Sequence, residues 1–104
     1  MKPLQGLKVL DFSTVLPGPY ATMLLADMGA DILRVESPSR PDLVRLMEPQ
    51  MGGQSAAFEY LNRGKKSLGI NLKHRQSIEI IHSLLAEYDI LVEQFRPGVM
   101  DRLG

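Results

Sequence analysis

Short apolar runs, each bounded by glycine or polar residues, recur along the chain. Runs of four to eight residues rich in Val, Ile and Leu predict buried β-strands. The four runs are LKVLDF (7–12), DILRVE (31–36), KSLGINL (66–72) and DILVEQF (89–95).

Helical patterns separate these runs. Residues 19–28 are apolar on nearly every side, which predicts a buried helix with Gly18 as N-cap, Pro19 at its first position and Gly29 as its stop. Residues 75–88 carry one apolar stripe, typical of an amphipathic helix. Residues 43–62 have no clear pattern except a short helix around 56–61, and residues 96–104 open another helix or turn.

Strand, helix, strand with short joints is a βαβ unit. The sequence therefore predicts an α/β fold with a Rossmann-like parallel sheet and right-handed crossovers, over residues 1–104 as one region. Its strands are apolar enough to be covered on both faces, yet few helices are available to cover them. We expect part of a larger fold.

Composition narrows the function classes. Twelve Asp and Glu balance twelve Lys and Arg, which argues against nucleic-acid or membrane-surface partners. The chain has no cysteine, and the spacing of its two histidines, His74 and His82, does not suit a metal site, so we expect no metal. It also lacks a long apolar run or a signal-peptide pattern, and a cytoplasmic location is expected.

Ligands of open parallel sheets bind beyond the carboxyl ends of the strands. The helix entrance at Gly18 faces this edge and suits an anion, although Pro19 removes one donor. Glu36 stands near the spacing of a ribose-binding acid, but no G-x-G-x-x-G pattern accompanies it, so an NAD site is not expected. The basic window at 63–75 suits either a phosphorylated ligand or a solvated face.

Three segments in order, LKVLDFSTVLPGPYATMLLADMGADILRVE, NRGKKSLGINLK and LVEQFRPGVMDRLG, closely resemble the N-terminal part of the class III coenzyme A transferases. This family, also called CaiB/BaiF, includes formyl-CoA and carnitine-CoA transferases and α-methylacyl-CoA racemases. The resemblance covers essentially the whole chain and implies coenzyme A or an acyl-CoA as the ligand.

The resemblance also implies which residues line the coenzyme A site. They are Val15, Leu16, Pro17, Ile70, Lys73, Gln94, Phe95 and Arg102. Two departures stand out: Gln94 replaces the commoner Asn, which would lengthen or remove its hydrogen bond, and Ser37 replaces a basic residue that binds the ribose phosphate. Arg34 or Arg40 is a candidate substitute.

In this family the catalytic aspartate, and the His and Asp pair of the racemases, lie well beyond position 104. We therefore expect no catalytic residue here and no activity from residues 1–104 alone. The implied parent reaction moves CoA from an acyl-CoA to a carboxylic acid through an aspartyl intermediate, in a homodimer. The alternatives are a racemase fragment and a non-catalytic binding fragment.

Overall fold

Four parallel strands form the central sheet of the computed structural model, which describes residues 2–104. The strands lie in the order β5-β2-β1-β6. Their bounds are β1 Lys8–Asp11, β2 Asp31–Glu36, β5 Lys66–Gly69 and β6 Ile90–Val92. The α/β fold with a parallel sheet, expected from the sequence, is confirmed.

Three of the four strands are shorter than their apolar runs, because a strand persists only where a neighbour pairs with it. Ile70 still donates its N–H to the Glu36 carbonyl at 3.0 Å, but β2 ends there and β5 has no partner further on. After β6, the Glu93 carboxylate accepts the N–H of Phe95 at 2.9 Å, so the chain turns locally.

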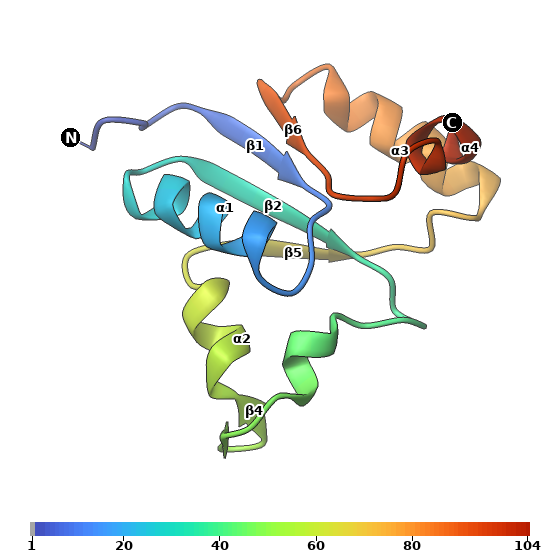
Figure 1. Cartoon of the computed structure of the whole chain (residues 1–104). Helices are drawn as coiled ribbons and strands as arrows, with labels where there is room; N and C mark the ends of the chain where they lie inside the picture. The colour runs from blue at the N-terminus through green and yellow to red at the C-terminus, as the bar shows by residue number, and fades with distance from the viewer. Residues whose placement is uncertain (1) are drawn as a thin grey trace.

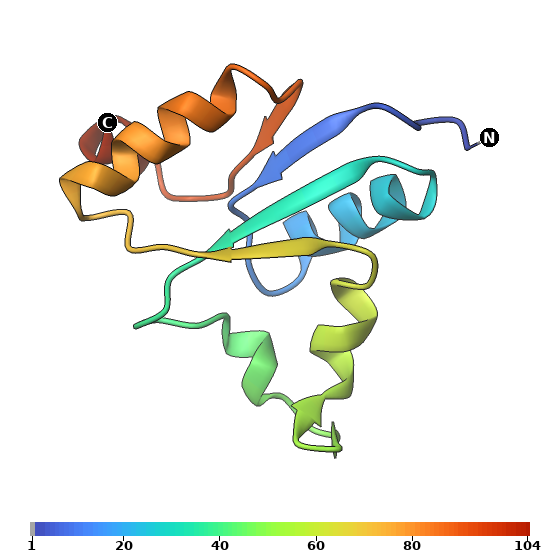
Figure 2. The same cartoon turned by 180° about the vertical axis from the view of Figure 1, so that it is seen from behind.

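Helices cover both faces of the sheet. Helix α1, Pro17–Asp27, packs with Leu25 and Ala26 against Val9 and Ile32, whereas α3, Arg75–Leu85, packs with Ile81 against Leu10. Figures 1 and 2 show α1 in front of the sheet in one view and behind it in the other.

Helix α1 corrects two expectations. It begins two residues early, with Leu16 as N-cap, so Gly18 is not the cap and Pro19 is the third helical residue. Both prolines are tolerated because the N–H groups of a first turn have no helical partner. The helix is also not buried all round, since Tyr20 and Leu24 remain 48% and 42% exposed.

The remaining elements lie between β2 and β5 and after β6. The predicted helix at 56–61 is confirmed as α2, Ala56–Leu61, and helix α3 ends three residues earlier than expected. The unassigned segment also holds the 3-10 helix η1, Leu43–Leu46, and a hairpin of β3, Gln50–Met51, and β4, Gln54–Ser55. The segment 43–62 lies beyond the β5 edge of the sheet (Figure 1). The last helix is α4, Val99–Leu103.

Candidate functional site

The strand order reverses between β1 and β6, because β2 and β5 lie on one side of β1 and β6 on the other. In open parallel sheets such a switch point opens a crevice at the carboxyl ends of the strands. Here the loops on the two sides of the switch point are residues 12–16, which follow β1, and residues 93–98, which follow β6. The switch point is the natural ligand position of this fold.

Gln94 ties the two loops together. Its side-chain amide donates to the Thr14 carbonyl at 2.5 Å, and its Oε1 accepts the N–H of Gly18 at 3.1 Å. The start of α1 lies so close to the loop that a Cβ on Gly18 would fall 2.1 Å from the Cβ of Ser13. Only glycine fits there.

Buried polar groups also hold the loop of residues 12–16 in place. The Asp11 carboxylate is fully buried and accepts the N–H and hydroxyl of Ser13 and, at 2.6 Å, the hydroxyl of Thr22. The ammonium of Lys65 lies 3.7 Å from Asp11 and donates to the Pro19 carbonyl at 3.1 Å. Burial lowers the pKa of Lys65 to about 8, against the opposing attraction of Asp11.

A second buried cluster holds the segment after β2. Arg34 pairs with Glu36 and with Asp42, each at 2.9 Å, and Arg45 pairs with Glu36 at 2.7 Å. The hydrogen bond from Arg45 is the largest cause that lowers the pKa of Glu36 to about 2. Phe58 lies against both guanidinium groups, 3.8 Å from Arg45 and 5.2 Å from Arg34.

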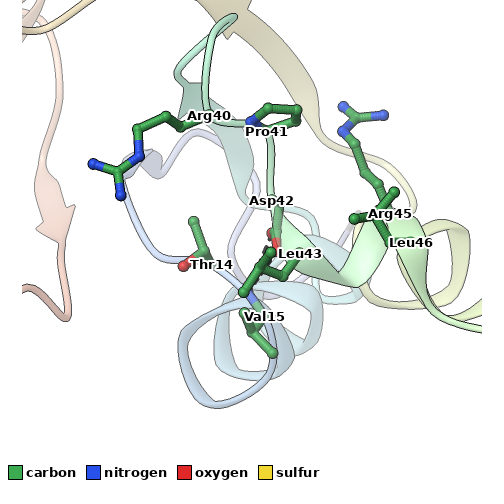
Figure 3. A pocket seen from close by; sticks show the side chains of 8 residues that line it. All are labelled: Thr14, Val15, Arg40, Pro41, Asp42, Leu43, Arg45 and Leu46. Carbon is green, nitrogen blue, oxygen red and sulfur yellow. Dashed lines mark hydrogen bonds between the residues drawn. The ribbon is translucent and has the colours of Figure 1, made fainter.

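Two cavities open on this edge, and Thr14 and Arg40 line both. One has a volume of about 570 Å³ and a largely apolar wall (Figure 3). Its lining comprises Thr14, Val15, Arg40, Pro41, Asp42, Leu43, Arg45 and Leu46. The other, of about 430 Å³, lies closer to the switch point, and its polar and charged lining comprises Thr14, Glu36, Ser37, Ser39, Arg40, Asn71 and Lys73.

The structure gathers some of the expected residues at these cavities. Lys73 and Phe95 line the smaller cavity and Val15 the larger one. Ile70 packs against the core beneath the edge. Four of the expected residues line neither cavity: Leu16, Pro17, Gln94 and Arg102. They lie in the loops and helices around this edge of the sheet.

The basic residues at 63–75 divide into those whose side chains pair with carboxylates of the protein and those whose side chains do not. Arg63 pairs with Asp27 at 2.7 Å, Lys66 with Asp31 at 3.7 Å, and Lys65 is buried beside Asp11. Within residues 2–104 the ammonium group of Lys73 has no hydrogen-bond or ion-pair partner, and Lys73 is among the residues that line the smaller cavity. The guanidinium of Arg75 also has no partner within these residues, but Arg75 lines neither cavity, so Lys73 is the residue of the window available to a ligand at this site.

Arg34 is wrong as a substitute for the missing basic residue after Glu36. Its side chain is 2% exposed and both of its terminal nitrogens are occupied by carboxylates. Arg40 does line both cavities. Sequence reasoning missed Thr14, Ser39 and Asn71, although all three follow a strand end and the strand-end rule points to that position.

Among residues 2–104, no group of three or more His, Cys, Asp or Glu side chains is placed to hold a metal ion. None of the helices in this range is both long enough and apolar enough to span a bilayer.

Comparison with known proteins agrees with this architecture. The chain is 44% identical over 102 residues to acetyl-CoA:oxalate CoA-transferase of Acetobacter aceti, and 41% identical over 105 residues to succinyl-CoA:glutarate CoA-transferase of Homo sapiens. These matches cover 98% and 100% of this chain but only 26% and 24% of the relatives, so the chain spans about a quarter of their length.

Solved structures show the same relationship. The chain superposes on Rv3272, a hypothetical protein of Mycobacterium tuberculosis, with a TM-score of 0.90 and 38% identity, over 100% of this chain and 28% of that one. A CaiB/BaiF family protein of Brucella suis gives 0.89 and 36%, over 98% and 28%. The sequence model of CoA-transferase family III matches residues 4–104. This chain belongs to CoA-transferase family III, and it corresponds to the N-terminal region of the family's proteins.

Proposed function

We propose that the protein containing this chain moves CoA from an acyl-CoA to a carboxylic acid, and that this chain supplies much of the site for the nucleotide end of CoA. The observation that carries the proposal is the smaller cavity at the switch point, whose lining includes two cationic residues, Lys73 and Arg40, and two hydroxyl residues, Ser37 and Ser39. Cations and hydroxyls at strand ends are suited to phosphate oxygens.

The proposed binding residues divide by position. Lys73 and Phe95 line the cavity, and Arg40 takes the place of the basic residue expected at position 37. We propose that Arg102, on α4, reaches a CoA phosphate when the ligand is bound. Val15, Leu16 and Pro17 form the backbone wall at the start of α1, and Ile70 supports the floor. Gln94 acts through Thr14 and Gly18, whose loop it fixes.

The acids of this chain support a binding rather than a catalytic role for it. Asp11, Glu36 and Asp42 are buried at the edge, and each carboxylate already accepts three donors or more. A nucleophilic carboxylate must instead reach the thioester carbonyl, form the acyl anhydride and release the CoA thiolate. We propose that an aspartate outside residues 1–104 performs this step.

The test is transfer by the protein at its full length. It is incubated with formyl-, acetyl- or succinyl-CoA and isotopically labelled oxalate or glutarate, the classes named in the relatives, and the products are identified by mass spectrometry. Labelled acyl-CoA product supports the proposal. Absence of transfer with every pair, or turnover by residues 1–104 alone, contradicts it.

A further inference from the structure

We propose that Asp42 is a positioning residue of the CoA site: its carboxylate holds the strained backbone of Val15 and thereby fixes the wall that the two cavities share. The inference rests on the proposed function for its ligand, but its structural part can be measured without CoA.

The backbone at Val15 is strained. Its φ is 65°, the left-handed region, and it is the one non-glycine residue with a positive φ within residues 2–104. A β-branched side chain is a genuine outlier there, because its Cβ crowds the backbone. Such a conformation persists only where surrounding contacts enforce it, and these positions cluster at ligand sites.

Asp42 provides the enforcing contact. The Val15 N–H lies 3.0 Å from Oδ1 and 3.2 Å from Oδ2 of Asp42, twenty-seven residues further along the chain. The carboxylate is itself immobilised, because its side chain is fully buried, pairs with Arg34 at 2.9 Å and accepts the Val44 N–H at 3.1 Å. Figure 3 shows Asp42 beside Val15 at the base of the larger cavity.

This contact joins two loops that both face the ligand edge. Residues 12–16 contribute Thr14 to both cavities, and residues 37–42 contribute Arg40 to both. Without the carboxylate, Val15 can relax to an extended conformation, which displaces Thr14 and separates the loops. Asp42 therefore sets the shape of the wall without contacting the ligand's reacting atoms.

A double-mutant cycle tests this role in the full-length protein. Asp42→Ala removes both acceptor oxygens, so the Val15 N–H loses its partner, as do the Val44 N–H and the Arg34 guanidinium. We expect a CoA dissociation constant raised at least fivefold, and a raised KM for acyl-CoA with kcat changed less than twofold. In a Val15→Gly background, where the left-handed conformation is unstrained, the same change should raise the dissociation constant less than twofold. Glu79→Gln, an exposed acid on α3, controls for loss of one charge.

Hydrogen exchange provides a readout that does not need CoA. The Val15 amide of the wild-type protein should exchange slowly with or without CoA, and faster in Asp42→Ala, while the amides of β1 and β2 stay protected. Rapid exchange of the wild-type Val15 amide, or an equal loss of affinity in both backgrounds, overturns the inference. A wild-type protein that binds no CoA refutes the proposed function and the positioning role with it, while the exchange rates still report whether Asp42 holds Val15.

Discussion

The side chain of Gln94 is bonded to the carbonyl of Thr14 across eighty residues of sequence. The same side chain accepts the N–H of Gly18, so one amide spans the two loops that flank the switch point. An asparagine is one methylene shorter and cannot make both bonds with this backbone. Both polar atoms of the Gln94 amide thus make hydrogen bonds within the protein.

Gly18→Ala should disrupt this junction. The added Cβ would lie 2.3 Å from the hydroxyl oxygen of Ser13 and 2.9 Å from Oε1 of Gln94, so the loop must move. Overpacking of this kind costs about 1–3 kcal/mol of unfolding free energy. Gly69→Ala is the control, because its Cβ meets Pro38 at an ordinary 3.8 Å. Urea denaturation that gives equal stability for the two variants would contradict the close packing at Gly18.

Glu36→Gln should lower stability at neutral pH by about 2 kcal/mol, because charge-assisted hydrogen bonds from Arg45 and Arg34 are lost. The pKa of Glu36 is lowered to about 2 from 4.5, so its contribution is full above 4.5 and lost as pH falls toward 2. The difference between wild type and variant should shrink across this window, as followed by chemical denaturation. Glu87→Gln, on the exposed surface, is the control. A difference that stays constant with pH would exclude the ion pair as its source.

Lys65→Met should destabilise the fold by about 2 kcal/mol at pH 7, because the Pro19 carbonyl and Asn62 Oδ1 each lose a hydrogen bond that contributes about 1 kcal/mol. Burial lowers the pKa of Lys65 from 10.5 to about 8, and repulsion from Arg34 lowers it further. The attraction of Asp11 and, more weakly, of Asp42 opposes this shift. The unfolded chain thus binds more protons between pH 8 and 10.5, and the contribution of Lys65 to stability rises with pH there. The wild-type advantage over the variant should widen across that range in denaturation curves. A gap that stays constant would show that the pKa of Lys65 is not shifted by folding, and a gap that narrows would show that it is raised.

Local patterns in the sequence predicted the strand centres, the bounds of α2 and the stop at Gly29, whose φ of 104° favours glycine. They also predicted the edge of the sheet at which the two cavities open. These features depend on residues near one another in the chain. The start of α1 was misplaced because two prolines, Pro17 and Pro19, are both compatible with a first turn.

Features that depend on distant partners were not predictable. A valine favours extended backbone, and nothing near Val15 indicates that Asp42 holds it in the left-handed region. The basic window could not be divided before Asp11, Asp27 and Asp31 were placed beside it. Arg34 had a usable signal, since residues 34 and 36 share one face of a strand and favour an ion pair.

Calorimetric titration of the full-length protein with CoA tests the central claim most directly. If Lys73 and Arg102 bind CoA phosphates, Lys73→Ala and Arg102→Ala should each weaken binding roughly tenfold or more, because a charged hydrogen bond contributes about 1.5–3 kcal/mol, and the loss should diminish in high salt. Lys66→Ala, an exposed lysine at the opposite end of β5, should bind as wild type. Unchanged affinity in both the Lys73 and Arg102 variants would contradict a nucleotide site at this edge of the sheet.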